Sequence, residues 1–351
     1  MGVYIVRRQL RSLMLMSSRK ATALLILCLI TLLSACGGQN EGMQTLASRE
    51  VPYFYAVGND PVTLTQAYLI VGNTEGYYRE YMIPGYTTIT GQAGMCVGKS
   101  GRVYIGETNI VYTSSSEDYS SWSSQTIGAT FMSFAATPSG DFLLRNNVPT
   151  PVLYLFEKGS NSWVDAGKTT TLSNAVSKCC YSSSYYKLLV LGTDGADTYI
   201  QELTTATALN TIAYYPFIDT VNLHFFAEVG GGYYIGNSTQ GLFLNGVLIG
   251  PEVDLYSFAV VSPSEIFAAN NSMTLPLCLL RLRGGIFVPE LIFSSLSASG
   301  NVVLWPAPPD HVIIGINDTT DIDGLYLYDF RKFSLKKLNS MPIYAVYSRT
   351  P

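Results

Sequence analysis

Short runs of β-branched and aromatic residues, separated by polar and glycine-rich segments, fill the chain from residue 51 onward. No stretch after residue 50 keeps apolar residues at helical spacing for ten residues. Apolar runs of this length, bounded by Gly, Asn, Asp, Ser and Pro, are typical of strands in all-β folds. The pattern therefore predicts a body built from many short strands.

One phrase recurs in this body, namely an apolar strand that ends in glycine. Its copies are residues 67–72, 102–106, 187–192, 232–236 and 311–315, and two variants are residues 140–144 and 264–268. The final glycines of the copies lie 34, 86, 44 and 79 residues apart, and each wide interval holds one variant. The sequence therefore predicts seven units of about 40 residues, and a period in this range indicates a repeat architecture.

Each unit carries further strand candidates. Residues 242–249 predict a two-residue hairpin, because Asn245-Gly246 tolerates the positive φ angles of a type I′ turn. The runs 53–57 and 343–347 are candidates for a pair that joins the two ends of the body.

Four short strands every 40–50 residues or so, repeated seven times, resemble a β-propeller. A single four-stranded blade cannot bury both of its faces, whereas stacking blades around an axis buries both and leaves only short edges. We therefore expect an all-β fold, a β-propeller of seven blades with four antiparallel strands each. A pair of β-sandwiches and a solenoid are the alternatives.

Two local patterns are similar to those of known propeller classes. Tyr154-Leu155-Phe156 followed by Ser162-Trp163 resembles the strand–turn–Trp pattern of kelch units. Residues 114–122 resemble the Asp-box hairpin of sialidase-type propellers: Ser116, Asp118 and Trp122 match, but Ser120 replaces the glycine and one residue is missing. Neither pattern repeats, so they support the architecture and not a subfamily.

The first 35 residues have the features of an export signal. Five basic residues precede the apolar run 21–33, and no acidic residue occurs before Glu41. The run is shorter than the ~20 residues that a membrane-spanning helix needs. It closes with Leu33-Ser34-Ala35-Cys36, which resembles the lipobox of bacterial lipoproteins.

That resemblance implies cleavage before Cys36 and lipidation of Cys36 itself. The expected domains are a signal peptide (1–35), a flexible tether that carries the lipidated Cys36 (36–50) and the propeller (51–351). Gly37 stands where Asp would imply retention at the inner membrane, so we expect a lipid-anchored protein of the outer membrane. An ordinary cleaved signal peptide and an uncleaved anchor are the alternatives.

Composition removes several classes of function. The net charge is −4, and it becomes 16 − 25 = −9 once the five basic and no acidic residues of the signal are removed, which argues against a nucleic-acid-binding surface. His224 and His311 are the only histidines, which excludes a His-rich metal site. Charged residues are 13% of the chain and hydrophobic residues 48%, a balance that argues against disorder.

Candidate binding motifs are few. Residues 93–100 fit a relaxed phosphate-binding loop, but the strand pattern after Gly101 replaces the helix that such a loop needs, so we interpret the segment as a tight turn. Asp318, Asp321 and Asp323 form a weak calcium candidate in one loop, without the EF-hand spacing. We expect no cofactor and otherwise no metal.

Four cysteines follow Cys36, namely Cys96, Cys179, Cys180 and Cys278. Export permits disulfides, and four cysteines allow three pairings. Adjacent Cys179 and Cys180 should point to opposite faces of a strand. Bridges and buried free thiols both stay open.

Nothing in the sequence assigns a catalytic residue. A Ser–His–Asp triad would need one of the two histidines, and no Gly-x-Ser-x-Gly elbow occurs. A sialidase-like site would need three arginines around a carboxylate and a tyrosine nucleophile, and no such set can be chosen from the sequence. Most of the 25 tyrosines should pack between blades, while Tyr77, Tyr78 and Tyr119 in loops are candidates for ligand contact.

The sequence therefore favours a membrane-anchored lipoprotein whose propeller is a non-catalytic module that binds a protein or a glycan of the cell envelope. The alternative is a glycoside hydrolase or polysaccharide lyase that acts on envelope or host glycans. A third reading is an assembly factor of the outer membrane. Lipid, and not the acidic body, would hold the protein at the membrane.

Overall fold

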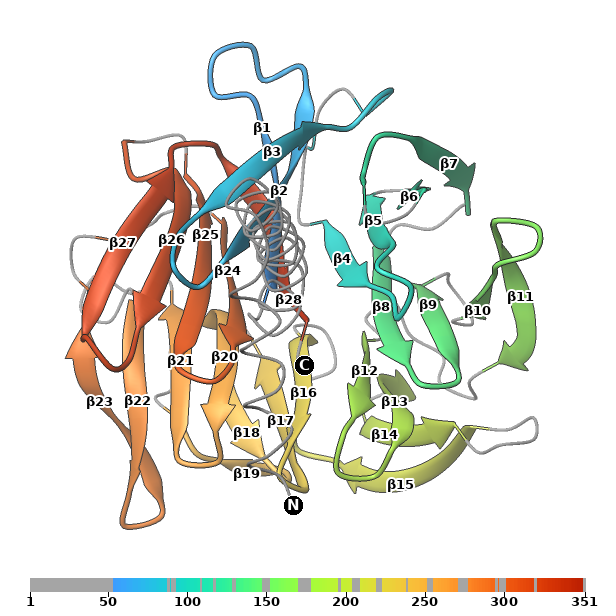
Figure 1. The fold of residues 1–351 in the computed structure, drawn as a ribbon. Helices are drawn as coiled ribbons and strands as arrows, with labels where there is room; N and C mark the ends of the chain where they lie inside the picture. The colour runs from blue at the N-terminus through green and yellow to red at the C-terminus, as the bar shows by residue number, and fades with distance from the viewer. Residues whose placement is uncertain are drawn as a thin grey trace, which may run out of the picture. The chain divides into compact units, whose positions relative to one another are not determined.

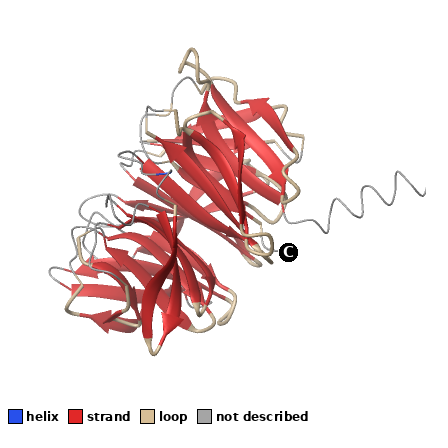
Figure 2. Cartoon of the chain, turned by 90° about the vertical axis from the view of Figure 1, so that its left-hand side faces the viewer, coloured by secondary structure: helices blue, strands red, loops and turns tan. Residues whose placement is uncertain are grey.

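The computed structural model describes residues 53–349 except 87–88, 90–92, 108, 116–117, 128–130, 147–151, 170–177, 195–196, 204–208, 219–222, 238, 251–254, 271–276, 294–295, 297–300 and 319–320. The predicted signal peptide, Cys36 and the tether lie outside the described residues. Pro52–Pro351 form one compact unit. All its described elements are strands, as Figure 2 shows. Among the described residues, no helix is long and apolar enough to cross a membrane.

The strands form seven antiparallel sheets of four strands each, which we number as blades 1 to 7. Blade 1 is β28 (Ile343–Ser348), β1 (Tyr53–Asn59), β2 (Ala67–Asn73) and β3 (Tyr78–Met82); blade 2 is β4 (Gly94–Val97), β5 (Val103–Glu107), β6 (Ile110–Ser114) and β7 (Trp122–Thr126); blade 3 is β8 (Phe131–Thr137), β9 (Gly140–Asn146), β10 (Val152–Glu157) and β11 (Ser162–Thr169); blade 4 is β12 (Lys178–Ser182), β13 (Lys187–Asp194), β14 (Asp197–Leu203) and β15 (Leu209–Tyr215). Blade 5 is β16 (Leu223–Val229), β17 (Gly232–Asn237), β18 (Gly241–Leu244) and β19 (Val247–Leu248); blade 6 is β20 (Leu255–Ser262), β21 (Glu265–Asn270), β22 (Leu277–Arg283) and β23 (Ile286–Ile292); blade 7 is β24 (Asn301–Ala307), β25 (His311–Asn317), β26 (Gly324–Asp329) and β27 (Ser334–Asn339).

The first strand of every blade contacts the first strands of both neighbouring blades, so β28, β4, β8, β12, β16, β20 and β24 make a closed ring. Figure 1 shows these strands near the centre and outer strands such as β11, β15, β23 and β27 at the rim. The prediction of an all-β, seven-bladed propeller is confirmed. Neither a pair of sandwiches nor a solenoid closes in this way.

The two ends of the body meet in blade 1. Strand β28 pairs antiparallel with β1, with Tyr55 opposite Tyr347 and Val57 opposite Ala345. The predicted pairing of residues 53–57 with 343–347 is therefore confirmed. A single C-terminal strand thus becomes the innermost strand of a blade whose other three strands are N-terminal.

The repeated phrase marks the second strand of six blades, namely β5, β9, β13, β17, β21 and β25. Its predicted first copy, residues 67–72, lies instead on β2, the third strand of blade 1. The second strand of that blade is β1, which also ends in a glycine followed by asparagine, Gly58-Asn59. The first copy of the phrase was assigned to the wrong strand because β1 and β2 carry almost the same pattern. The predicted number of seven blades is nevertheless correct, because β1 and β2 belong to the same blade.

Buried side chains gather between the blades, as expected if blade faces rather than one central core carry the apolar surface. One such layer joins Leu69, Val103 and Ala345 of blades 1 and 2, and another joins Phe267, Ile314 and Tyr328 of blades 6 and 7. The predicted hairpin is also present between β18 and β19, with φ near 50° at Asn245 and 81° at Gly246.

Candidate functional site

One face of the propeller carries the turns that join the first strand to the second in blades 2 to 7, and we call it the first-turn face. Its turns contact one another around the ring. The Tyr185 hydroxyl in the blade 4 turn donates to the Gly231 carbonyl in the blade 5 turn at 3.4 Å. After β28 ends, the Arg349 guanidinium donates to the Lys99 carbonyl in the blade 2 turn at 3.1 Å. The C-terminal segment therefore lies on this face beside blade 2.

A pocket of about 220 Å³ opens where the first turns of blades 2 and 3 meet the β10–β11 turn. Its lining consists of Lys99, Thr137, Pro138, Ser139, Gly140, Asp141, Leu155, Phe156 and Lys158. The pocket thus combines two amines, two hydroxyls and one carboxylate with an apolar wall.

Asp141 lies buried in the lining of the pocket and is held from blade 2. The Tyr104 hydroxyl donates to its Oδ2 at 2.7 Å, and the Lys99 backbone N–H donates to its Oδ1 at 3.4 Å. A Cβ on Gly98 would lie 2.2 Å from the same Oδ2, so the approach of the carboxylate to this turn requires glycine. Burial, with the charge of Asp141, raises the pKa of Tyr104, so the phenol stays protonated as a donor.

The amines of the pocket are not neutralised by neighbouring carboxylates. Lys99 and Lys158 are exposed, and neither forms an ion pair within the part of the chain that the structure describes. Arg102 lies close by and donates to Ser114 and Asn161 oxygens at 3.2 and 2.6 Å. Four cationic side chains therefore lie at or near the pocket, although the chain as a whole is acidic. They are Lys99, Arg102, Lys158 and Arg349. Such a cluster attracts an anionic group.

Two aromatic side chains of the innermost strands pack together between blades 7 and 1. The rings of Trp305 on β24 and Tyr347 on β28 have centroids 4.9 Å apart and planes inclined by 37°. Tyr347 also shares a hydrogen bond with the thiol of Cys96 on β4. This contact links the aromatic pair to the blade that carries Lys99.

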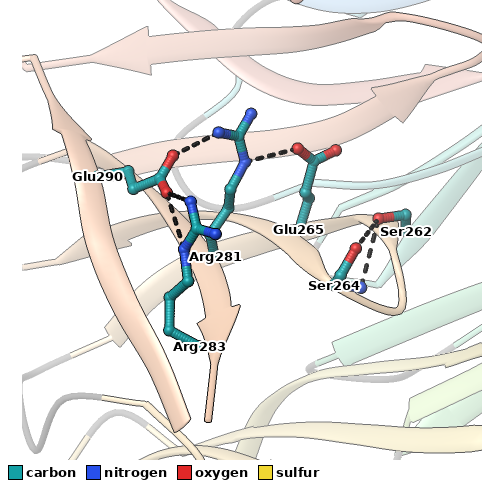
Figure 3. Close-up of polar contacts among 6 residues, drawn as sticks. All are labelled: Ser262, Ser264, Glu265, Arg281, Arg283 and Glu290. Carbon is teal, nitrogen blue, oxygen red and sulfur yellow. Dashed lines mark hydrogen bonds and ion pairs between the residues drawn. The ribbon is translucent and has the colours of Figure 1, made fainter. Parts of the chain in front are cut away.

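A second polar cluster crosses the strands of blade 6 (Figure 3). Arg281 on β22 bonds to Glu265 on β21 at 2.8 Å and to Glu290 on β23, and Arg283 also bonds to Glu290. The bonds from both arginines lower the pKa of Glu290. The two arginines and two glutamates balance in charge, so the cluster ties three strands together and leaves no free charge for a ligand.

The structure separates the candidates for catalysis. His224 lies on β16 and His311 on β25, in different blades. The His311 ring lies 3.5 Å from Asp329, and burial lowers its pKa. The pair Arg281 and Arg283 is engaged by carboxylates, and the described residues bring no third arginine to it.

The calcium candidate occupies the loop between β25 and β26. The Asp318 backbone N–H donates to the Asp323 carboxylate, and the Asp321 carbonyl accepts a 3.0 Å bond from the Lys337 amine. Among the described residues, no group of three or more His, Cys, Asp or Glu side chains could hold a metal ion. These contacts are those of a loop that joins two strands.

All four cysteines of the body are free thiols, and Cys96, Cys179 and Cys278 are buried. Burial raises the pKa of Cys179 to about 11 and that of Cys278 to about 11. Of the two open alternatives, the structure has buried thiols and not bridges.

The remaining sequence motifs lie in turns and loops between strands. Residues 98–101 form the tight turn between β4 and β5, with Gly101 at a φ of 80°, and a strand follows in place of a helix. The Asp-box-like segment joins β6 to β7, where Asp118 accepts bonds from Ser120. Tyr77 is 72% exposed, as a contact residue should be, whereas Tyr119 is only 7% exposed and packs against Tyr81. Tyr119 therefore does not meet the expectation of ligand contact.

Lys158, Asp141 and Trp305 were not among the residues that the sequence analysis singled out, and Lys99 lies in the segment 93–100, which it interpreted as a tight turn. Asp141 follows the glycine of the variant phrase 140–144, and its polar side chain inside an apolar strand is a signal that could have marked it. The second strand of each blade also ends in an amide or acidic residue, which is a further signal that the sequence analysis missed. These residues are Asn59, Glu107, Asn146, Asp194, Asn237, Asn270 and Asn317. Two of them hold loops: the Asn59 side chain bonds both backbone groups of Ile89, and the Asn237 side chain accepts from Thr239 and Gln240.

No protein-family model matches the chain, and no curated protein matches it in sequence. Solved structures match it in fold. One assigned provisionally as a 6-phosphogluconolactonase from Bacteroides fragilis has 8% identity and a TM-score of 0.59, with 86% of this chain and 98% of that chain covered. A protein from Lactobacillus plantarum has 12% identity and a TM-score of 0.60, with 86% and 100% covered. A puromycin hydrolase has 11% identity and a TM-score of 0.54, with 83% of this chain and 54% of that chain covered. At these identities the similarity shows the fold alone.

Proposed function

We propose that the protein is a non-catalytic binding module whose ligand carries an anionic group held in the pocket between blades 2 and 3. The observation that supports this most directly is the pair of unpaired lysines, Lys99 and Lys158, at the rim of that pocket. Hydrogen bonds from ammonium groups to carboxylate or phosphate oxygens are about twice as strong as neutral ones. The Thr137 and Ser139 hydroxyls also line the pocket, where they bond to each other at 2.9 Å, and they add polar groups beside the two amines.

The pocket favours binding over catalysis because its one acid is already engaged. Hydrolysis of a glycosidic bond uses two carboxyl groups on either side of the bond. Asp141 is the pocket's carboxylate, and the Tyr104 hydroxyl holds one of its oxygens. A hydrolase or lyase is the alternative, and the lactonase and hydrolase among the similar folds are the reason to test it.

The experiment is calorimetric titration of the purified mature protein with tripolyphosphate and citrate at low and high salt. We expect binding that weakens with salt, and a loss of about tenfold in affinity in the Lys99→Gln/Lys158→Gln double variant. Lys336→Gln, an exposed lysine on β27, is the matched control. Unchanged affinity in the double variant would reject the proposed site, and turnover of a model lactone or glycoside by the same preparation would favour the enzyme.

We also propose that the module is held at the outer membrane by lipid on Cys36. The support is the lipobox-like sequence Leu33-Ser34-Ala35-Cys36, together with the acidic charge of the body, which would not hold it to anionic lipid. Stable anchoring needs more than one acyl chain, as lipoprotein processing supplies. Cys36→Ser should abolish metabolic labelling with a fatty acid and release the protein from membranes. Persistent labelling would contradict the proposal.

A further inference from the structure

We propose that the ligand of the first-turn face is an acidic glycan, with a sugar ring stacked on Trp305 and Tyr347 while its carboxylate or phosphate groups lie at Lys99, Lys158 and Arg349. This inference rests on the proposed function, because it extends the same pocket towards the axis. It adds a second contact of a different kind and names the class of ligand.

Trp305 is unusual for a residue on a first strand. Its side chain is 37% exposed, although Leu304 and Ala307 of the same strand are buried. Its indole packs against the ring of Tyr347, with the two planes inclined by 37°. An exposed aromatic surface packed in this way suits the apolar face of a pyranose ring, because little conformational entropy is lost on contact.

The aromatic pair and the cationic pocket lie on the same side of the ring. Trp305 comes two residues before the end of β24, and Tyr347 comes one residue before the end of β28. First strands end at the first-turn face, so both rings approach that face. The charge of Arg349 acts on Tyr347, and the Arg349 guanidinium bonds to the carbonyl of Lys99, which lines the pocket.

The groups therefore follow one another in a series. The aromatic pair comes first, then Arg349, then Lys99, and last the pocket with Lys158. A chain of sugar rings with one negative charge on each ring presents apolar faces and anions in alternation, and it can use every member of this series. An acidic peptide could use the cations but would gain little from the stacked indole. The acidic glycan is therefore the class that the series favours.

The test is titration of the mature protein with tetragalacturonate, phosphorylated maltotetraose, neutral maltotetraose and poly-glutamate. We expect one of the two acidic sugars to bind at least about tenfold more tightly than neutral maltotetraose, since charge-assisted bonds are then added to stacking. Which acidic sugar binds separates a carboxylate ligand from a phosphate ligand.

Three variants separate this inference from the proposed function. Trp305→Leu should weaken acidic-sugar binding by about three- to tenfold and leave tripolyphosphate binding unchanged, while Trp305→Phe should retain most of the sugar affinity. Lys99→Gln/Lys158→Gln should weaken both ligands. If Trp305→Leu, checked for normal thermal unfolding, bound the sugars as wild type does, the glycan inference would fail and the anion pocket would stand. Equal or tighter binding of poly-glutamate would likewise overturn it in favour of an acidic protein partner, whereas insensitivity to the lysine variants would remove the proposed function itself.

Discussion

The hydroxyl of Tyr104 on β5 donates a 2.7 Å hydrogen bond to the carboxylate of Asp141 on β9, across the contact between blades 2 and 3. Both side chains are buried, and the indole of Trp163 packs against Tyr104 with ring centroids 5.0 Å apart. The same bond therefore joins two blades and fixes the carboxylate in the lining of the candidate pocket.

Loss of this bond should destabilise the propeller. Tyr104→Phe removes the strongest partner of a buried carboxylate, and we expect a cost of about 1–3 kcal/mol in the free energy of unfolding. Urea unfolding monitored by fluorescence measures it. Tyr77→Phe removes a hydroxyl from a side chain that is 72% exposed and should have almost no effect. Equal stabilities of the two variants would show that the inter-blade bond contributes nothing.

The glycine of the repeated phrase is expected to be essential where the blades come closest. A Cβ on Gly315 would lie 2.4 Å from a methyl carbon of Ile343 in blade 1 and 2.8 Å from one of Val303. Gly315→Ala should therefore cost about 1–3 kcal/mol through overpacking. Gly159→Ala adds a methyl group in open space and serves as the control. A Gly315→Ala variant as stable as that control would mean that the two blades can move apart freely.

The ion cluster of blade 6 should depend more on one arginine than on the other. Arg281 is 30% exposed and bonds to two glutamates, whereas Arg283 is 63% exposed and bonds to one. We expect Arg281→Met to lower the free energy of unfolding by up to about 1 kcal/mol, and Arg283→Met by less, because solvent screens exposed pairs. Chemical unfolding at low and high salt compares them, and a larger loss in the Arg283 variant would contradict the ranking.

Stability should fall in acid through Asp329. Bonds from the Lys332 amine and from the backbone N–H groups of Arg331 and Lys332 lower the pKa of Asp329 to about 2. A carboxyl group whose folded pKa lies below its unfolded value of 3.8 stabilises the fold above that value, and the contribution is lost as the pH falls towards 2. Asp329→Asn should therefore be less stable than wild type at pH 6 and should lose less stability between pH 4 and about 2.

The measurement is the urea midpoint across this range, with Glu75→Gln on the exposed β2–β3 turn as a control for loss of one negative charge. Parallel pH profiles of wild type and Asp329→Asn would show that Asp329 does not titrate as expected.

The thiols should be accessible only after unfolding. Burial raises the pKa of Cys179 and Cys278, so these thiols stay protonated and unreactive near neutral pH. Alkylation with iodoacetamide should modify few sites in the native mature protein and all four of Cys96, Cys179, Cys180 and Cys278 after denaturation without reductant. A mass that requires reductant for full alkylation would instead reveal a disulfide.

The sequence predicted the architecture because a propeller repeats the same physical solution in every unit. The strand that ends in glycine recurs because the second strand of each blade packs between neighbouring blades. The first copy was assigned to β2 instead of β1, but the predicted number of blades stayed at seven. The closing pair was also predictable, because residues 53–57 and 343–347 are both strongly apolar.

The candidate site could not be predicted in the same way. Lys99, Asp141 and Trp305 come from three different blades, and only the ring closure brings their surroundings together on one face. Lys158 is an ordinary turn residue in sequence, and Lys99 belongs to the segment 93–100, which fits a relaxed phosphate-binding loop but was interpreted as a tight turn. What distinguishes them is that neither amine forms an ion pair within the described part of the chain, and this depends on their neighbours in the fold.

The position of β28 also has a consequence for how the protein is made. Strand β28, the innermost strand of blade 1, is made after all the other described strands, so β1 keeps an open edge until residues 343–348 have been synthesised. The newly made chain must hold that edge unpaired for the time needed to deliver almost three hundred further residues, from Asn59 to Ile343. A holding chaperone would be needed most during this interval, and a chain that stopped before Ile343 would leave the edge of β1 unpaired.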